Sequence, residues 1–238
     1  MAPGVTEVLS ARVLDRNASG RREAIVAGLQ WISEHPRVDV ICIAMGISFA
    51  SNMSAHAQSA QANRQDLTQT LAKDLREYVQ LLRTYQSFSA VAASLGKGAV
   101  LIMPAGNDSQ PNARVPVTSP ISVAQGVISV GAVQQGNSGY QVAFFSNSLP
   151  TVCAPGVEIL SAHLGGKLRS LQGTSMSCAN AAGIAALWWE CLRSRNPGRE
   201  ITSRMVAAEM LKAARTDVFT RDTQEIDRGA GLLQAPPR

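Results

Sequence analysis

A pair of hydroxyl residues beside a run of small residues is the strongest chemical feature of the sequence. Residues 171–187 read LQGTSMSCANAAGIAAL, with Thr174 and Ser175 directly after a glycine. We expect a buried helix of small side chains to begin here, with Thr174 as its N-cap. Ser175 would then lie in the first turn, where free N–H groups and the helix dipole favour a developing negative charge. The hydroxyl could act as a nucleophile, or the pair could simply cap a core helix.

A serine without a base is a weak nucleophile, so the histidines are the next residues of interest. The sequence has three, His35, His56 and His163. We expect His35 at the end of a helix, where it interacts with the C-terminal dipole, and His56 in an exposed polar segment. His163 is closest to Ser175 along the chain and is the one local candidate for a base, which requires both reach and orientation.

The elements that would position these residues follow an α/β pattern. We expect a strand over 5–14, a helix over 22–34 and a strand buried on both faces over 38–45. A strand, a helix and a strand within about 40 residues predict a βαβ unit and a parallel sheet. Further strands are expected at 98–103, at 126–133 and near 142–145, 156–160 and 167–171, and further helices at 66–82, about 175–193 and about 202–215.

Composition favours one well-packed α/β domain. Hydrophobic residues make up 45% of the chain and charged residues 16%, which excludes a disordered chain or a coiled coil. The net charge of +5 is spread over mixed basic and acidic positions, whereas a nucleic-acid binder shows a stripe of one sign, so we expect no nucleic-acid partner. The sequence contains no stretch of about 20 apolar residues, so we expect no membrane span.

The four cysteines, Cys42, Cys153, Cys178 and Cys191, form no CxxC pair, so we expect no metal knuckle. Cys178 and Cys191 are expected on one helix, about 20 Å apart and too far to bridge. We therefore expect free, mostly buried thiols, which favour a reducing compartment. MAPGVTEV has neither the charged nor the apolar region of a signal peptide, and the sequence leaves the localisation unknown.

Several segments, in the same order along the chain, resemble the subtilisin-like serine proteases, or subtilases. GTSMSCANAAG resembles the family's serine segment, VLIMPAGNDS its strand ending in A-G-N, and VDVICIAMG its strand ending in N-x-S-x-G. SARVLDRNASGRREAIVAGLQWI, FFSNSLPTVCAPGVEILSA and DRGAGLLQA resemble three further segments. The resemblance covers nearly the whole chain. It implies an α/β fold with a doubly wound, mainly parallel sheet flanked by helices.

The resemblance implies a catalytic role for two residues. Ser175 would attack the scissile carbonyl of a polypeptide substrate. The side-chain amide of Asn107 and the backbone N–H of Ser175 would hold the resulting oxyanion. Taken alone, Asn107 in AGNDS is equally consistent with a turn-forming asparagine.

The resemblance also implies a substrate-binding groove. Ala44, Met45 and Gly46 would pair with an extended substrate by strand addition, and Ala105 and Gly106 would line the first specificity pocket. No metal ligands are expected. Calcium is common in the family, but the sequence has no convincing acidic cluster for it, and no other cofactor is implied.

The departures from the family pattern concern the other two triad residues. In the family the triad runs Asp, His, Ser along the chain, and neither D-[ST]-G nor H-G-T-H occurs here. MAPGV matches a stretch that follows the His segment, so we expect residues 1–238 to form a single partial catalytic domain that lacks its N-terminal strands. The missing strand that carries the Asp would lie between 5–14 and 38–45, and its loss would leave two apolar edges.

Smaller departures lie in the matched segments. Cys178, Ala179 and Asn180 replace the family's usual Ser-Pro-His, and Ala44 replaces a Ser. The stretch between Gly46 and Gly98 is longer than usual, which predicts a helical insertion around 47–95.

Three explanations fit these observations: a truncated serine endopeptidase, a split enzyme whose Asp and His come from a separate segment or chain, and a non-catalytic relative that uses the groove for peptide binding or assembly. Retention of both Ser175 and Asn107 favours the first two, since a binding module needs neither. Because loss of the His costs about 10⁶ in turnover in subtilisin, we expect this chain alone to be almost inert.

Overall fold

A computed structural model describes most of the chain outside the segment between 46 and 97. The described residues are 2–15, 22–35, 38–45, 68, 69, 72, 75, 76, 79, 83, 98–110, 112–116 and 122–237. The strands of its main sheet are β1 (Val40–Cys42), β2 (Val100–Pro104), β3 (Val127–Gly136), β4 (Gly139–Val142) and β5 (Val152–Pro155). The helices are α1 (Arg22–Ser33), α4 (Thr174–Arg195), α5 (Ser203–Lys212) and α6 (Glu225–Arg228).

The main sheet is parallel except at one strand. β1, β2 and β3 lie side by side and parallel, and β5 runs parallel to β3, whereas β4 returns antiparallel to it. A separate two-stranded hairpin is formed by β6 (Ile159–His163) and β7 (Lys167–Leu171), joined by the short helix η2 (Leu164–Gly166). The parallel sheet predicted from the βαβ pattern is confirmed.

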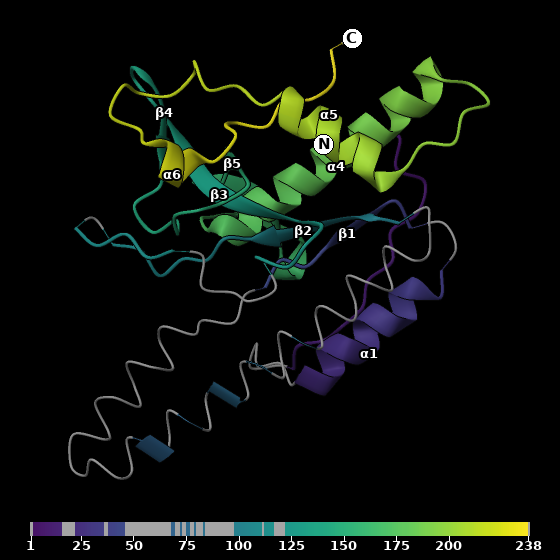
Figure 1. Cartoon of the computed structure of the whole chain (residues 1–238), viewed down its shortest axis with the longest axis horizontal. Coiled ribbons are helices and arrows are strands. Elements are labelled where there is room, and N and C mark those ends of the chain that lie inside the picture. Colours follow the sequence, from purple (N-terminus) through teal and green to yellow (C-terminus); the bar gives the residue numbers. More distant parts are fainter. Residues whose placement is uncertain are drawn as a thin grey trace.

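Helices cover both faces of this sheet, as Figure 1 shows. Successive side chains of a strand point to opposite faces, and β2 illustrates the result. Ile102 is buried in the cluster formed with α4 and α5, while the next residue, Met103, packs against Leu29 of α1. The sheet is therefore doubly wound, as expected.

The helix α4 lies close to the sheet because its facing side chains are small. Ala181 and Ala185 are fully buried, and α4 packs against β1, β2, β3 and β5. Further along, two tryptophans fill the wider space, and each indole N–H has a carbonyl partner: Trp188 donates to Gln234 (3.0 Å) and Trp189 to Asp39 (2.7 Å). The second bond ties α4 to the start of β1.

Most of the predicted elements are confirmed, with shifts of a few residues at their ends. The helices expected at 22–34, 175–193 and 202–215 and the strands expected at 98–103, 126–133 and 167–171 correspond to α1, α4, α5, β2, β3 and β7. The C-terminal segment after α5 also contains the short helix α6, which the sequence pattern did not predict.

The strand predicted over 5–14 is wrong. These residues form no strand, and Val8 is 83% exposed. Instead the segment lies against α1, where a Cβ on Gly28 would come within 2.7 Å of the Val13 side chain. An extended segment needs a neighbouring strand to satisfy its N–H and C=O groups, and none of the described residues provides one here.

The strand predicted over 38–45 is also shorter than expected. β1 has three residues, and its side chains are half-buried or exposed instead of buried on both faces. The reason is its position, because β1 is the outermost strand of the described sheet and has a partner on one side only.

The helix predicted over 66–82 falls largely outside the described residues. Those described between Thr68 and Arg83 are helical and exposed, and Leu75 is 59% exposed. The rest of the predicted insertion at 47–95 stays a prediction. Among the described helices, none combines the length and apolarity needed to cross a bilayer.

We predict that the α5 contact with the sheet layer is a major source of stability. Met210 is fully buried against the α4 cluster, so Met210→Ala should lower the free energy of unfolding by about 2–5 kcal/mol. Urea denaturation would measure the loss. Arg204→Ala, at an exposed position of the same helix, is the control and should change the midpoint little; equal losses in both variants would contradict the prediction.

Candidate functional site

The predicted site residues gather at one edge of the sheet. β1 and β2 are parallel, so the segments that leave their carboxyl ends emerge at the same edge. Ala44 and Met45 follow β1, and Ala105, Gly106 and Asn107 follow β2. The N–H of Ile43 donates to Ile102 (3.0 Å), which extends the pairing beyond β1 towards this edge.

Asn107 is joined to the start of α4 by two hydrogen bonds. Its Oδ1 accepts from the backbone N–H of Thr174 (2.9 Å) and from the Thr174 hydroxyl (2.9 Å). A backbone N–H can only donate, so the oxygen of the carboxamide must face Thr174, which removes the usual ambiguity between the two ends of an amide. The Nδ2 group of Asn107 is therefore directed away from Thr174, and it has no protein partner among the described residues.

The buried hydroxyl of Thr174 connects this asparagine to the turn before it. Thr174 Oγ1 accepts from the N–H of Gly106 (3.2 Å) while donating to Asn107, and the residue is fully buried. The predicted N-cap role is wrong, because the cap of α4 is Gly173, with φ of +151°. The threonine hydroxyl bonds across to the β2 turn instead of to its own helix.

Ser175 lies in the first turn of α4, as predicted, and is half-buried. The N–H groups of Met176 and Ser177 donate to the carbonyl of Gly173. First-turn N–H groups have no partner within a helix, and that of Ser175 has none elsewhere in the part of the chain that is described. Two donors without a partner among the described residues, this N–H and Asn107 Nδ2, thus belong to groups that are connected through Thr174. Such a pair is suited to an oxyanion.

A second asparagine, Asn147, holds the turn that carries Asn107. Its Oδ1 accepts from the N–H groups of Asp108 (2.9 Å) and Ser109 (3.0 Å), and its Nδ2 donates to the Ala105 carbonyl (3.3 Å). Gly106, at φ of +113°, leaves room for this amide, which a Cβ would strike. The sequence pattern does not predict this role of Asn147, whose only signal is its place in the FFSNS segment.

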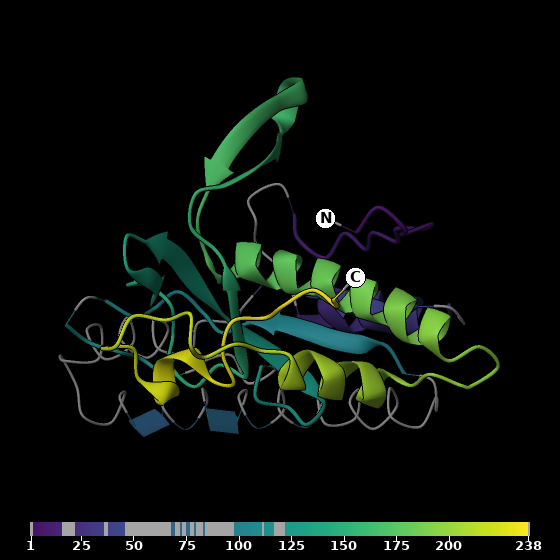
Figure 2. The same ribbon diagram turned by 90° about the horizontal axis from the view of Figure 1, so that it is seen from above.

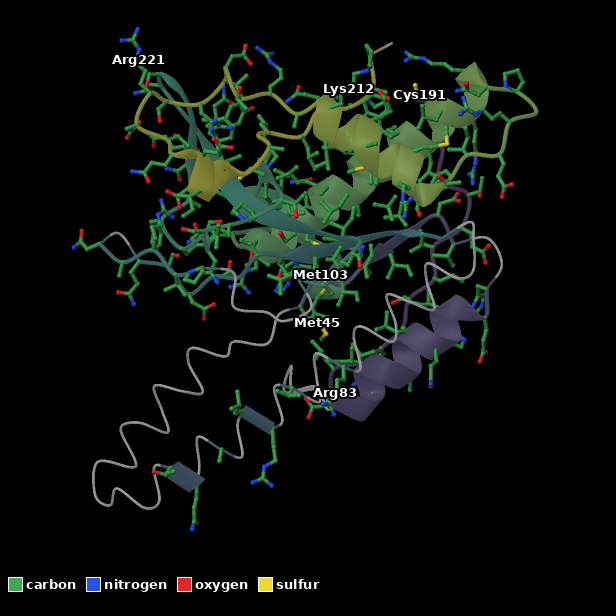
Figure 3. The ribbon with its side chains drawn as sticks, viewed as in Figure 1. Met45, Arg83, Met103, Cys191, Lys212 and Arg221 are labelled. Atoms are coloured by element: carbon green, nitrogen blue, oxygen red, sulfur yellow. The ribbon has the colours of Figure 1, made fainter. Side chains whose placement is uncertain are left out.

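The predicted substrate-binding residues are placed as follows. Ala44 is exposed and Met45 half-buried, with the Met45 side chain on the α1 side of the sheet (Figure 3). Gly46 lies outside the described residues. Gly106 is half-buried, but Ala105 is fully buried, so at this point only its backbone is a candidate for substrate contact. The groove itself stays a prediction.

The histidines do not supply a base from the described residues. His163 ends β6 at the far end of the hairpin and pairs with Lys167 beside the turn, and Figure 2 shows this hairpin standing away from α4. At about 3.3 Å per residue, the strand carries His163 roughly 13 Å from the hairpin base. The predicted helix-end role of His35 is confirmed, since its Nδ1 donates to the carbonyl of Trp31 (2.8 Å). His56 lies outside the described residues.

The described residues do not offer a metal centre. No group of three or more His, Cys, Asp or Glu side chains gathers among them.

Comparison with known proteins gives one consistent family. The family model described as "Subtilase family" matches residues 1–232. Two similar curated proteins are subtilisin-like protease 3 of Pseudogymnoascus destructans and the cuticle-degrading serine protease of Arthrobotrys oligospora, each 30% identical over 76% of this chain. The chain spans 37% and 36% of their lengths.

A solved structure shares the fold. A lanthipeptide protease matches with a TM-score of 0.66 over 94% of this chain and 66% of its own, at 19% identity. At that identity the likeness shows the fold alone.

We predict that the Thr174 hydroxyl stabilises the site and the fold together. Thr174→Val keeps the shape but leaves the Gly106 N–H without its acceptor, which should lower the free energy of unfolding by about 1–3 kcal/mol. Thr174→Ser keeps the hydroxyl and should lose less. Chemical denaturation of both variants tests this. A valine variant as stable as the wild type would contradict the prediction, and a serine variant as unstable as the valine variant would show that the methyl group matters as much as the hydroxyl.

Proposed function

This chain belongs to the subtilase family, and we propose that it is the serine-bearing part of a serine endopeptidase that cleaves peptide bonds through an acyl-enzyme on Ser175. The observation that carries the proposal is the orientation of Asn107. Its oxygen is held by Thr174, so its N–H₂ group is free to act beside the residue that follows, Ser175. A structural asparagine would need no unpaired donor at that point.

In the proposed reaction, Ser175 Oγ attacks the scissile carbonyl and the carbonyl oxygen becomes an oxyanion. Asn107 Nδ2 and the Ser175 N–H donate to that oxygen. Both donors are fixed before the reaction, because α4 holds one and Thr174 holds the other, so little reorganisation is needed as charge develops. In subtilisin, loss of the corresponding asparagine costs about 10²–10³ in kcat, or about 2.7–4 kcal/mol.

The base and its orienting acid are proposed to come from a segment outside residues 1–238, in a longer chain or a separate one. Two observations support this. No described histidine lies beside Ser175, and β1 ends the described sheet with one side unpaired. A strand added to that side would satisfy its free N–H and C=O groups and give residues 5–14 a neighbour. The acid expected on such a strand would then approach the carboxyl edge where Asn107 and Ser175 lie.

The proposed substrate is an extended polypeptide. It would pair with the backbone of residues 44–46, where the chain leaves β1, and present its scissile carbonyl to Ser175 at the same edge. Ala44 is exposed there, which leaves its backbone accessible to a second strand.

We predict that residues 1–238 alone react poorly with a fluorophosphonate probe, and that joining them to a segment carrying D-[ST]-G and H-G-T-H restores labelling. The label should map to Ser175 and vanish in Ser175→Ala. Ser177→Ala is a matched control two residues along the same helix. Its hydroxyl is fully buried without a partner among the described residues, so that variant should label normally.

Two outcomes would contradict the proposal. Full labelling of the unjoined chain would mean that a local residue serves as base. Absence of labelling in the joined protein, together with binding of an extended peptide, would favour the non-catalytic alternative.

We predict that Asn107→Asp in the joined protein lowers kcat about 10²–10³-fold with little change in KM. The aspartate keeps an oxygen to accept from Thr174 but lacks the Nδ2 donor, and its charge opposes the oxyanion. Steady-state kinetics on a peptide substrate and a melting curve test this together. Unchanged kcat would exclude Asn107 from the oxyanion site, whereas a large loss of stability would show that its role is structural.

A further inference from the structure

Two cysteines that are far apart in sequence meet between β1 and α4. The Sγ atoms of Cys42, the last residue of β1, and Cys178, in the second turn of α4, lie 3.4 Å apart. They are separated by 136 positions along the chain. The contact is set by the packing of α4 on β1, and no spacing pattern in the sequence indicates it.

The two thiols differ in environment. Cys42 is exposed, whereas Cys178 is fully buried. The hydrogen bond between the two thiols lowers the pKa of the Cys42 thiol, because it stabilises the Cys42 thiolate. The same hydrogen bond, with burial, raises the pKa of Cys178. Cys42, which has the lower thiol pKa and lies on the exposed edge strand, is therefore the residue that reacts first with an oxidant from solution.

We propose that Cys42 and Cys178 are a redox-sensitive modification site, at which a peroxide converts the two thiols into a reversible disulfide that links β1 to α4. Closing the bond requires the sulfur atoms to move from 3.4 Å to about 2.0 Å. Side-chain rotation of an exposed edge residue can supply that movement, because Cys42 is not packed on all sides.

The chemistry balances with one peroxide. The Cys42 thiolate attacks a peroxide oxygen, the O–O bond breaks, and the departing oxygen leaves as water, giving a sulfenic acid on Cys42. The Cys178 sulfur then attacks the Cys42 sulfur, the S–O bond breaks, and a second water carries away the remaining proton. Two thiols lose two electrons, and the peroxide gains them. A thiol reductant reverses the step.

The other two cysteines are poorly placed for this chemistry. Cys153 is fully buried, and burial beside Asp227 raises the pKa of its thiol to about 12. Cys191 is on α4 with Cys178 and lies about 20 Å further along the helix; Figure 3 shows it near the C-terminal half of α4. The described residues also add no third ligand that would make the pair a metal site.

The position of the pair gives the cross-link a consequence. Cys178 follows Ser175 by three residues, and Cys42 precedes Ala44 by two. A disulfide would therefore tie the predicted substrate strand to the predicted nucleophile helix, a consequence that rests on the proposed function. The cross-link itself does not, and it should form in this chain whether or not the chain is part of a protease.

The test is to treat the whole chain with hydrogen peroxide and map its thiols. We expect loss of two free thiols and a cross-linked peptide containing Cys42 and Cys178. Digestion must combine trypsin with a Glu-specific protease, because tryptic cleavage alone leaves Cys178 and Cys191 in one peptide and Glu190 separates them. Dithiothreitol should release the link, and the oxidised chain should melt about 5–10 °C higher than the reduced one.

Matched variants make the result decisive. Cys42→Ser should abolish the link and leave Cys178 reduced, while Cys191→Ser should form it normally. Oxidation of Cys42 to a sulfinic acid with Cys178 still free, or a wild-type link through Cys153 or Cys191, would overturn the proposal. Because peptide mapping is performed on the wild-type chain, the result does not depend on whether any variant folds, and it is independent of fluorophosphonate labelling.

Discussion

The hydrogen bonds between Asn107 and Thr174 are the interaction on which the rest of the site depends. They join the turn after β2 to the first residue of α4, so Asn107 and the residue next to Thr174, the proposed nucleophile Ser175, are held relative to each other through a single side chain. Thr174 also accepts from Gly106, and Asn147 holds the same turn from the opposite side. Neutral hydrogen bonds of this kind contribute about 1 kcal/mol each, but together they decide which end of the Asn107 amide faces Thr174.

The unpaired side of β1 is the second structural feature on which the proposed function rests. β1 is a short parallel strand with one unpaired side, and its side chains are half-buried or exposed. The extended segment before α1 does not pair with it. Ser175 and Asn107, the proposed nucleophile and oxyanion donor, lie near the carboxyl end of β2, where Thr174 holds the Asn107 oxygen and leaves the amide N–H₂ group without a partner among the described residues. The proposed base and acid belong on the unpaired side, so the catalytic set and the sheet would be completed by the same segment.

The pair formed by Cys42 and Cys178 lies where α4 packs against β1. Packing of a helix of small residues against β1 brings the two sulfur atoms together. The site thus rests on contacts between α4 and the carboxyl ends of β1 and β2. One contact is the set of hydrogen bonds between Asn107 and Thr174. The other is the thiol pair, which under the proposal above becomes a covalent disulfide on oxidation.

The sequence alone determined the elements with strong periodicity or a distinctive run of residues, namely α1, β2, β3, α4 and α5, together with the order of motifs that identifies the family and points to Ser175 and Asn107. Those features depend on neighbours along the chain, which the sequence displays directly. The loss of the 5–14 strand, the orientation of the Asn107 amide, the role of Asn147 and the meeting of Cys42 with Cys178 were decided by tertiary structure. Each depends on a partner many residues away, and whether a hydrogen bond or a strand pair forms is settled only when packing brings that partner into reach.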